Sequence, residues 1–180
     1  VVIAAERNTG KTTTVAHLVK RGWSFVTDET VRLCPFASDV SGFSKPLSIK
    51  PGALGHVQHL RSWTIPSLVP GQEGFAFVPI SASGAEVVEG GRPHLVICLR
   101  RPPGGETSSA PVARPLHAAD AVVALMQETL DAERFGHPTV RLAELAAMSH
   151  CYELTIGTPE RTADEIETLF AAEPADTLEV

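Results

Sequence analysis

The residues best suited to chemistry begin with a Gly-Lys-Thr triplet, Gly10-Lys11-Thr12, near the start of the printed sequence. An apolar run, residues 1–5, precedes this triplet, and a segment with helical spacing of apolar residues follows it. A strand, a tight loop and a helix in this order are typical of a phosphate-binding loop, whose backbone N–H groups surround an anion. In such a loop Lys11 would contact the β- and γ-phosphates of a nucleotide, and the Thr12 hydroxyl would bind Mg²⁺.

The predicted loop supplies a continuous set of candidate nucleotide-binding residues. They are Ala5, Glu6, Arg7, Asn8, Thr9, Gly10, Lys11, Thr12 and Thr13. The strict motif starts with Gly, whereas this chain has Ala5, and a methyl group is acceptable there if the backbone φ is negative. Arg7 would either contact a phosphate or point to solvent. The alternative interpretation of the whole stretch is a chance Gly-Lys-Thr triplet in a surface loop.

Two adjacent carboxylates, Asp28 and Glu29, follow residues 23–26, whose aromatic and β-branched side chains predict a strand. Carboxylates at the carboxyl end of a strand lie where ligands bind in α/β sheets. We take Asp28 as the catalytic base and Glu29 as a metal ligand with Thr12, although Asp28 could instead hold the metal through water. Adjacent side chains on a strand point in opposite directions, so both serve one site only if the chain turns there. A solvated acidic turn is the alternative.

A pair of arginines, Arg100 and Arg101, ends the most apolar stretch of the chain, residues 94–99, which predicts a buried central strand. A guanidinium suits a phosphate and would stabilise the charge of a phosphoryl group during transfer. Because side chains alternate along a strand, only one of the two arginines is expected to face the site, and Arg101 is the candidate catalytic residue. Two solvated arginines at the rim are the alternative.

Composition sets the class of protein. The chain has 180 residues, of which 43% are hydrophobic and 20% charged, as in a globular domain. The net charge of −6 argues against a broad nucleic-acid surface. Three cysteines without a CxxC motif predict a reducing, cytoplasmic location, and no apolar run is long enough to span a membrane. We therefore expect neither nucleic-acid nor membrane partners, with a homo-oligomer possible. Because the chain begins inside an apparent strand without Met, we also expect a portion to precede Val1.

Periodicity predicts an α/β fold with a mixed sheet and flanking helices. We expect one domain over residues 1–172 and a tail over residues 173–180. The first helix should cover residues 11–21, with Gly22 as its left-handed cap. Further strands are expected at residues 74–79 and 151–156, and further helices at residues 117–134, 140–149 and 162–172. Residues 34–55 should contain one short extended piece. Residues 102–115 are expected to form a mobile loop, in which the Pro- and Gly-rich residues 102–111 cannot hold a regular element.

The chain resembles the HPr kinase/phosphorylase-related kinases, which share a P-loop catalytic fold with PEP carboxykinase. The similar features are the phosphate loop, the strand ending in Asp28-Glu29, and the segment Lys45-Pro46-Leu47-Ser48-Ile49-Lys50. At the other end they are the apolar strand ending in Arg100-Arg101, the Pro/Gly-rich loop, and Cys151-Tyr152-Glu153-Leu154 before the last helix. The resemblance implies the P-loop nucleotide-binding fold of the HPr kinase C-terminal domain. It also implies ATP and Mg²⁺ as cofactors and phosphoryl transfer to a hydroxyl, usually a serine of a peptide or protein.

One departure limits what the resemblance implies. Bifunctional HPr enzymes carry a glutamate–arginine–glycine-rich signature downstream of the acidic pair, and residues 56–83 do not contain it. The resemblance therefore extends neither to HPr as substrate nor to phosphorylase activity. Our leading hypothesis is an ATP- and Mg²⁺-dependent kinase acting on a serine hydroxyl of a peptide or protein. The alternatives are a non-catalytic nucleotide-binding regulatory module and a small-molecule P-loop kinase.

Overall fold

The structure is a computed structural model, and it describes residues 1–34, 39–105, 110–129 and 138–173. The chain divides into two compact units. The first consists of Val1–Lys11, Leu33–Val40 and Gly91–Val180, and the second of Thr12–Arg32 and Ser41–Gly90. The expectation of one domain over residues 1–172 stays a prediction. Apart from its first residue, Glu173, the predicted tail lies outside the described residues.

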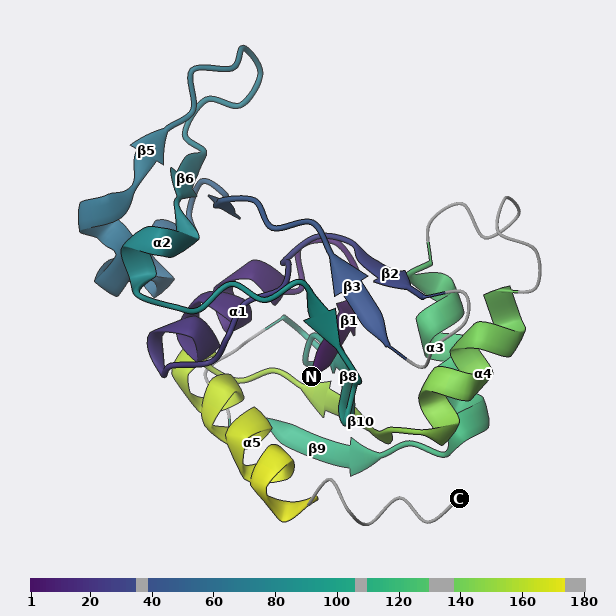
Figure 1. Ribbon diagram of the computed structural model, residues 1–180. Coiled ribbons are helices and arrows are strands. Elements are labelled where there is room, and N and C mark those ends of the chain that lie inside the picture. The colour runs from purple at the N-terminus through teal and green to yellow at the C-terminus, as the bar shows by residue number, and fades with distance from the viewer. Residues whose placement is uncertain (35–38, 106–109, 130–137, 174–180) are drawn as a thin grey trace. The chain divides into compact units, whose positions relative to one another are not determined.

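A four-stranded sheet, in the order β1-β8-β10-β9, forms the centre of the first unit (Figure 1). Its strands are β1 (Val2–Ala5), β8 (Leu95–Arg100), β10 (His150–Thr155) and β9 (Val112–Pro115). The first three strands are parallel, and β9 runs antiparallel to β10. Ala5 is paired with Leu99, so the chain leaves β1 and β8 at the same edge of the sheet, where ligands bind in open α/β sheets.

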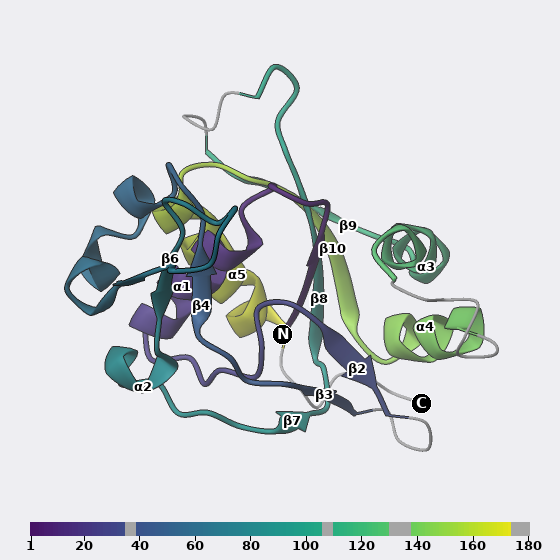
Figure 2. The same cartoon turned by 90° about the horizontal axis from the view of Figure 1, so that it is seen from above.

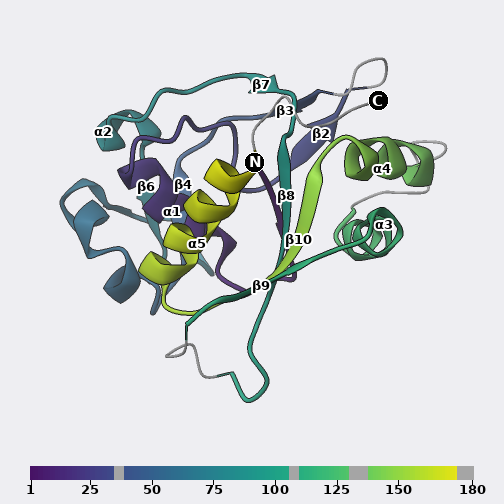
Figure 3. The same cartoon turned by 90° about the horizontal axis from the view of Figure 1, so that it is seen from below.

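Helices cover both faces of this sheet. The helices α3 (Ala118–Gln127) and α4 (Pro138–Ala147) lie on one side, and α5 (Pro159–Ala172) lies on the other (Figures 2 and 3). Because β8 is covered on both faces, its residues from Leu95 to Leu99 are all buried, which confirms the predicted central strand. The core on the α3 and α4 side contains Val2, Val96, Ala121, Leu125, Leu142, Leu145 and Cys151.

A local signal sets where α5 begins, and large apolar side chains are exposed on both α3 and α5. The Thr158 hydroxyl accepts a hydrogen bond from the Arg161 N–H, and Pro159 occupies the first turn, so α5 begins before the predicted residue 162. The helical spacing of Val123, Met126 and Phe170 predicts that they face the core, and this prediction is wrong because all three are exposed. The described part of α3 ends at Gln127, and residues 130–134 of the predicted helix lie outside the described residues.

The second unit is built around α1 (Lys11–Lys20), which lies in this unit from Thr12 onward, and an antiparallel sheet in the order β4-β6-β5. The strands of this sheet are β4 (Leu47–Ile49), β6 (Ala76–Val78) and β5 (Ile65–Pro66). The short helices are η1 (Leu54–His56), η2 (Gln58–Trp63) and α2 (Ile80–Ser83). The core of the unit contains Ala16, Val19, Phe25, Leu47, Ile49, Val57, Leu60, Val78 and Ile80.

The glycine cap predicted for the end of α1 is confirmed. Gly22 has a φ of 91°, in the left-handed region. Its N–H donates to the Val19 carbonyl at 3.0 Å, and the Trp23 N–H donates to the Leu18 carbonyl at 3.2 Å. This pair of bonds is the Schellman motif, which satisfies carbonyl groups that the end of a helix leaves without partners. Gly22 therefore fixes where the chain turns away from α1.

A third sheet has the order β2-β3-β7, and the chain passes from one unit to the other within each of its three strands. Its strands are β2 (Val31–Leu33), β3 (Val40–Gly42) and β7 (Gly90–Gly91).

Three predictions of local structure were wrong. Residues 23–26 form only an isolated bridge between Phe25 and Val87, residues 34–55 contain two strands rather than one, and β9 lies inside residues 102–115. The mixed sheet with flanking helices confirms the α/β class. Within the described residues, no helix is both long and apolar enough to cross a membrane.

Candidate functional site

The predicted phosphate loop connects the end of β1 to the start of α1. Ala5 is the last residue of β1 and is buried, whereas Glu6, Arg7 and Asn8 are exposed. Among the described residues Asn8 is the only non-glycine residue with positive φ, at 71°. The φ of Ala5 is therefore negative, so the backbone there does not need the glycine of the strict motif. The loop turn is closed by the Thr9 N–H, which donates to the Glu6 carbonyl at 3.3 Å.

Lys11 folds back over this loop. Its Nζ donates to the carbonyl oxygen of Ala5 and lies 3.4 Å from that of Glu6. Gly10, directly before Lys11, has a φ of 114°, a conformation that residues with a side chain rarely adopt. The ammonium group is thus held beside the exposed loop residues, which adds positive charge to backbone N–H groups that already favour an anion.

The two arginines at the end of β8, Arg100 as its last residue and Arg101 directly after it, have different partners, as alternation predicts. The Arg100 Nε lies 3.3 Å from the Glu153 Oε2 of β10, in an ion pair on the sheet. Arg101 instead donates from Nη2 to the carbonyl oxygen of Asn8 in the predicted phosphate loop. The register of β8 against β1 explains this reach, because Arg101 comes two residues after Leu99, the neighbour of Ala5. Of the pair, the structure brings Arg101 to the loop.

In the second unit the Thr12 hydroxyl donates to the Asp28 Oδ2 at 3.2 Å. The Phe25 N–H donates to the Glu86 carbonyl at 2.8 Å, which fixes the segment leading to Asp28. A Cβ added to Gly42 would lie 2.5 Å from the Thr27 Cγ2, so β3 can approach this segment only because residue 42 is glycine. Thr12 and Asp28 thus present two oxygen ligands side by side, the kind that Mg²⁺ prefers.

Asp28 is electrostatically unusual. Burial raises the pKa of its carboxyl above the ordinary 3.8, and this effect outweighs the lowering by Lys45 and by the Thr12 hydroxyl, while Glu29 raises it further. Its Oδ1 is buried and has no hydrogen-bond partner among the described residues. Buried polar atoms without partners are rare, so this oxygen is a candidate for binding a ligand or a proton.

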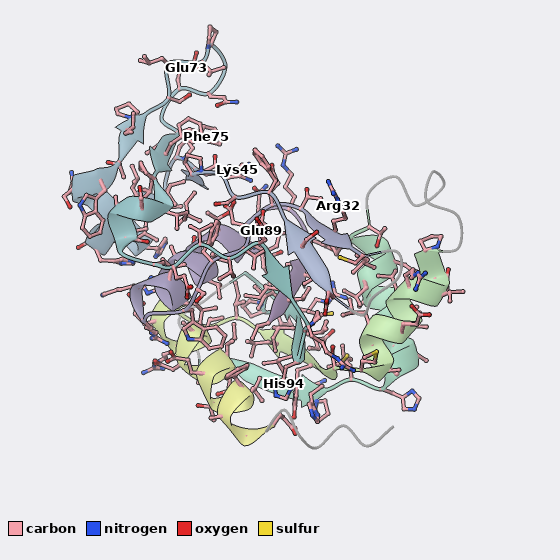
Figure 4. The ribbon with its side chains drawn as sticks, viewed as in Figure 1. Arg32, Lys45, Glu73, Phe75, Glu89 and His94 are labelled. Atoms are coloured by element: carbon pink, nitrogen blue, oxygen red, sulfur yellow. The ribbon has the colours of Figure 1, made fainter. Side chains whose placement is uncertain are left out.

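Glu29 turns to a different partner. The chain bends after Thr27, whose hydroxyl accepts a hydrogen bond from the Glu29 N–H at 3.3 Å. The Glu29 side chain is 65% exposed and forms an ion pair with Lys45, which comes from the segment between β3 and β4 and is labelled in Figure 4. The structure therefore pairs Thr12 with Asp28 and Glu29 with Lys45. The metal-ligand role of Glu29 stays a prediction.

Lys45 lies beside these carboxylates, but sequence reasoning did not identify it as a functional residue. The available signal was its place at the start of the Lys45–Lys50 segment quoted for the family resemblance. In the part of the chain that the structure describes, no three His, Cys, Asp or Glu side chains gather as a metal site. A Mg²⁺ site on a phosphate loop does not need such a group, because nucleotide phosphates and water supply most of its ligands.

Comparisons of the chain with protein-family models, with curated proteins and with solved structures give no match.

Proposed function

We propose that the protein is an ATP- and Mg²⁺-dependent kinase that transfers the γ-phosphoryl group of ATP to a serine hydroxyl of a peptide or protein. The observation that carries the proposal is the hydrogen bond from the Thr12 hydroxyl to Asp28. Thr12 completes the Gly-Lys-Thr motif, and a Thr of this motif with an Asp from elsewhere in the chain is the pair that holds Mg²⁺ in P-loop enzymes. A P-loop fold of the HPr kinase C-terminal type is part of this proposal.

The roles of the loop follow from its groups. The N–H groups after Ala5 and the ammonium group of Lys11 would bind the β- and γ-phosphates and orient the γ-phosphorus. Thr12 would hold Mg²⁺, with Asp28 or Glu29 as the carboxylate, and the ion would supply charge neutralisation at the phosphate oxygens. Arg101 reaches the same loop and adds a second positive charge there.

In the transfer step the serine oxygen forms a bond to the γ-phosphorus as the bond from that phosphorus to the bridging oxygen of ADP breaks. With Glu29 as the metal carboxylate, the hydroxyl proton moves to Asp28, and ADP leaves with the electron pair of the broken bond. The buried Oδ1 of Asp28 suits this proton because it has no other partner among the described residues. A raised carboxyl pKa also makes Asp28 a stronger base at neutral pH.

The deciding experiment is labelling of a native cell extract with purified protein and γ-labelled ATP, with and without Mg²⁺. Lys11→Ala should abolish transfer, whereas Lys20→Ala, at the exposed end of the same helix, should not. Mass spectrometry then separates a phosphorylated serine from a phosphorylated metabolite. Full transfer by Lys11→Ala would refute the proposed site. Tight Mg²⁺-dependent ATP binding without transfer to any acceptor would favour the regulatory module instead.

Asp28→Asn separates the two roles open to that residue. If Asp28 is the base, the variant binds Mg²⁺-ATP as tightly as the wild type and loses turnover. If Asp28 is a metal ligand, Mg²⁺-dependent nucleotide binding is itself weakened. Equilibrium binding of a fluorescent ATP analogue over a Mg²⁺ series distinguishes these outcomes. Unchanged turnover would contradict both roles.

A further inference from the structure

The phosphate loop contains a residue in a conformation that its type does not favour. Asn8 has a φ of 71°, in the left-handed region, where residues with a Cβ crowd the backbone. Asn tolerates this region better than most residues do, but Gly tolerates it without steric cost. The loop shape therefore carries a conformational cost at Asn8, and a contact that holds this conformation would offset part of it.

Arg101 provides such a contact. Its guanidinium donates to the carbonyl oxygen of Asn8, the residue at positive φ. Arg101 follows β8, whereas Asn8 follows β1, so the bond ties two separate segments that leave the sheet at one edge. The neighbouring Arg100 cannot take this role, because its side chain is paired with Glu153 on β10.

We propose that Arg101 is a positioning residue that holds Asn8 in its left-handed conformation and so keeps the phosphate loop in its binding shape before nucleotide arrives. This inference rests on the proposed function, but it gives Arg101 a different task from stabilising the transferring phosphoryl group. A loop that is already in its bound shape loses less conformational freedom on binding, so the benefit appears in nucleotide affinity.

The two tasks have different kinetic signatures. Loss of a positioning contact raises the Kd and KM for ATP and leaves kcat at saturating ATP unchanged. Loss of a group that acts only in the transition state lowers kcat and kcat/KM together. For Arg101→Ala we expect an ATP affinity weakened about tenfold, as for loss of one charge-assisted hydrogen bond. Arg101→Lys keeps one donor and should recover part of the affinity.

A readout that needs neither ATP nor catalysis tests the loop directly. Amide hydrogen exchange is measured by mass spectrometry on the nucleotide-free protein, following the peptide that contains Asn8. Arg101→Ala should accelerate exchange in this peptide about tenfold, whereas the matched control Arg100→Ala should not. In an Asn8→Gly background the loss of Arg101 should matter less, because Gly reaches positive φ without steric cost.

The outcomes are separable. Unchanged loop exchange in Arg101→Ala, an equal acceleration in Arg100→Ala, or a fall in kcat at unchanged KM would each overturn the inference. Faster loop exchange in Arg101→Ala supports the positioning role even if the protein binds no ATP, in which case the proposed function alone fails. ATP binding and transfer with unchanged loop exchange would refute the positioning role and leave the proposed function standing.

Discussion

Replacing Asp28 with Asn should stabilise the protein at pH 7 while it removes the proposed kinase turnover. The carboxyl is held where burial raises its pKa above 3.8, more than Lys45 and the Thr12 hydroxyl lower it. The folded state therefore binds the Asp28 proton more tightly than the unfolded chain does. The penalty for ionisation is absent below the unfolded pKa, grows as the pH rises through the folded pKa, and is constant above it.

The size of the gain follows from the unpartnered oxygen. A buried polar atom left without a hydrogen bond costs about 1–3 kcal/mol, and more when it carries charge. Asn keeps an oxygen that accepts from Thr12 at 3.2 Å and replaces the buried, unpartnered Oδ1 by a neutral group. Part of the cost remains, so we expect a gain of about 1 kcal/mol at pH 7. For a chain of this length that is roughly 2–4 °C in Tm.

Thermal unfolding followed by circular dichroism, with EDTA present, measures this difference for wild type and Asp28→Asn at pH 7 and near pH 4. The advantage of the variant should be largest at pH 7 and should shrink toward pH 4, where the wild-type carboxyl regains its proton. Glu29→Gln is the matched control, because its exposed ion pair with Lys45 is worth at most about 1 kcal/mol. A lower Tm for Asp28→Asn at pH 7, or an equal gain at both pH values, would refute the reasoning.

Three further predictions concern the rest of the chain. Gly22→Ala should lower the free energy of unfolding by about 1 kcal/mol, because φ at Gly22 is positive. Gly55→Ala is the control and should cause no such loss, because a Cβ there meets open space. Equal losses for the two variants in urea unfolding would contradict this prediction. Tyr152 is the only tyrosine, and its hydrogen bond to Glu173 with partial burial raises its pKa to about 12, so ultraviolet titration should show a lower value in Glu173→Gln. Burial raises the pKa of the Cys98 thiol to about 11, so iodoacetamide at pH 8 should label Cys98 only after unfolding in urea. Peptide mapping that finds Cys98 labelled in the native protein would be the contrary result, whereas label on the partly exposed Cys34 would not.

Sequence reasoning succeeded where a signal is local. The apolar run before Arg100 is best explained as a strand covered on both faces, and β8 is that strand. Gly22 ends α1 because its left-handed conformation is a property of the residue itself. The prediction missed β9 because it took the prolines of this segment as evidence against a strand. β9 ends at Pro115 and lies at the edge of its sheet, where a missing N–H is tolerated.

The contacts that organise the candidate site were beyond local signals. Thr12 and Asp28 are 16 positions apart, and nothing in either residue selects Asp28 over Glu29 as the partner of the hydroxyl. The choice is made by the bend after Thr27, which turns Glu29 toward Lys45. Alternation along a strand correctly separated Arg100, the last residue of β8, from Arg101. Which of the two reaches the loop depends on the register of two strands far apart in the sequence.

Ala5 changes the expected behaviour of the loop before any ligand is present. Gly at a position of negative φ gives the unfolded chain conformations that folding must remove, and Ala at such a position is more stable by about 0.4–1 kcal/mol. Because Ala5 completes β1 at negative φ, the conformational entropy of the unfolded chain is already reduced at this position. The departure from the strict motif therefore favours an ordered loop. A sequence pattern that requires glycine at this position would pass over loops in which the strand extends one residue further.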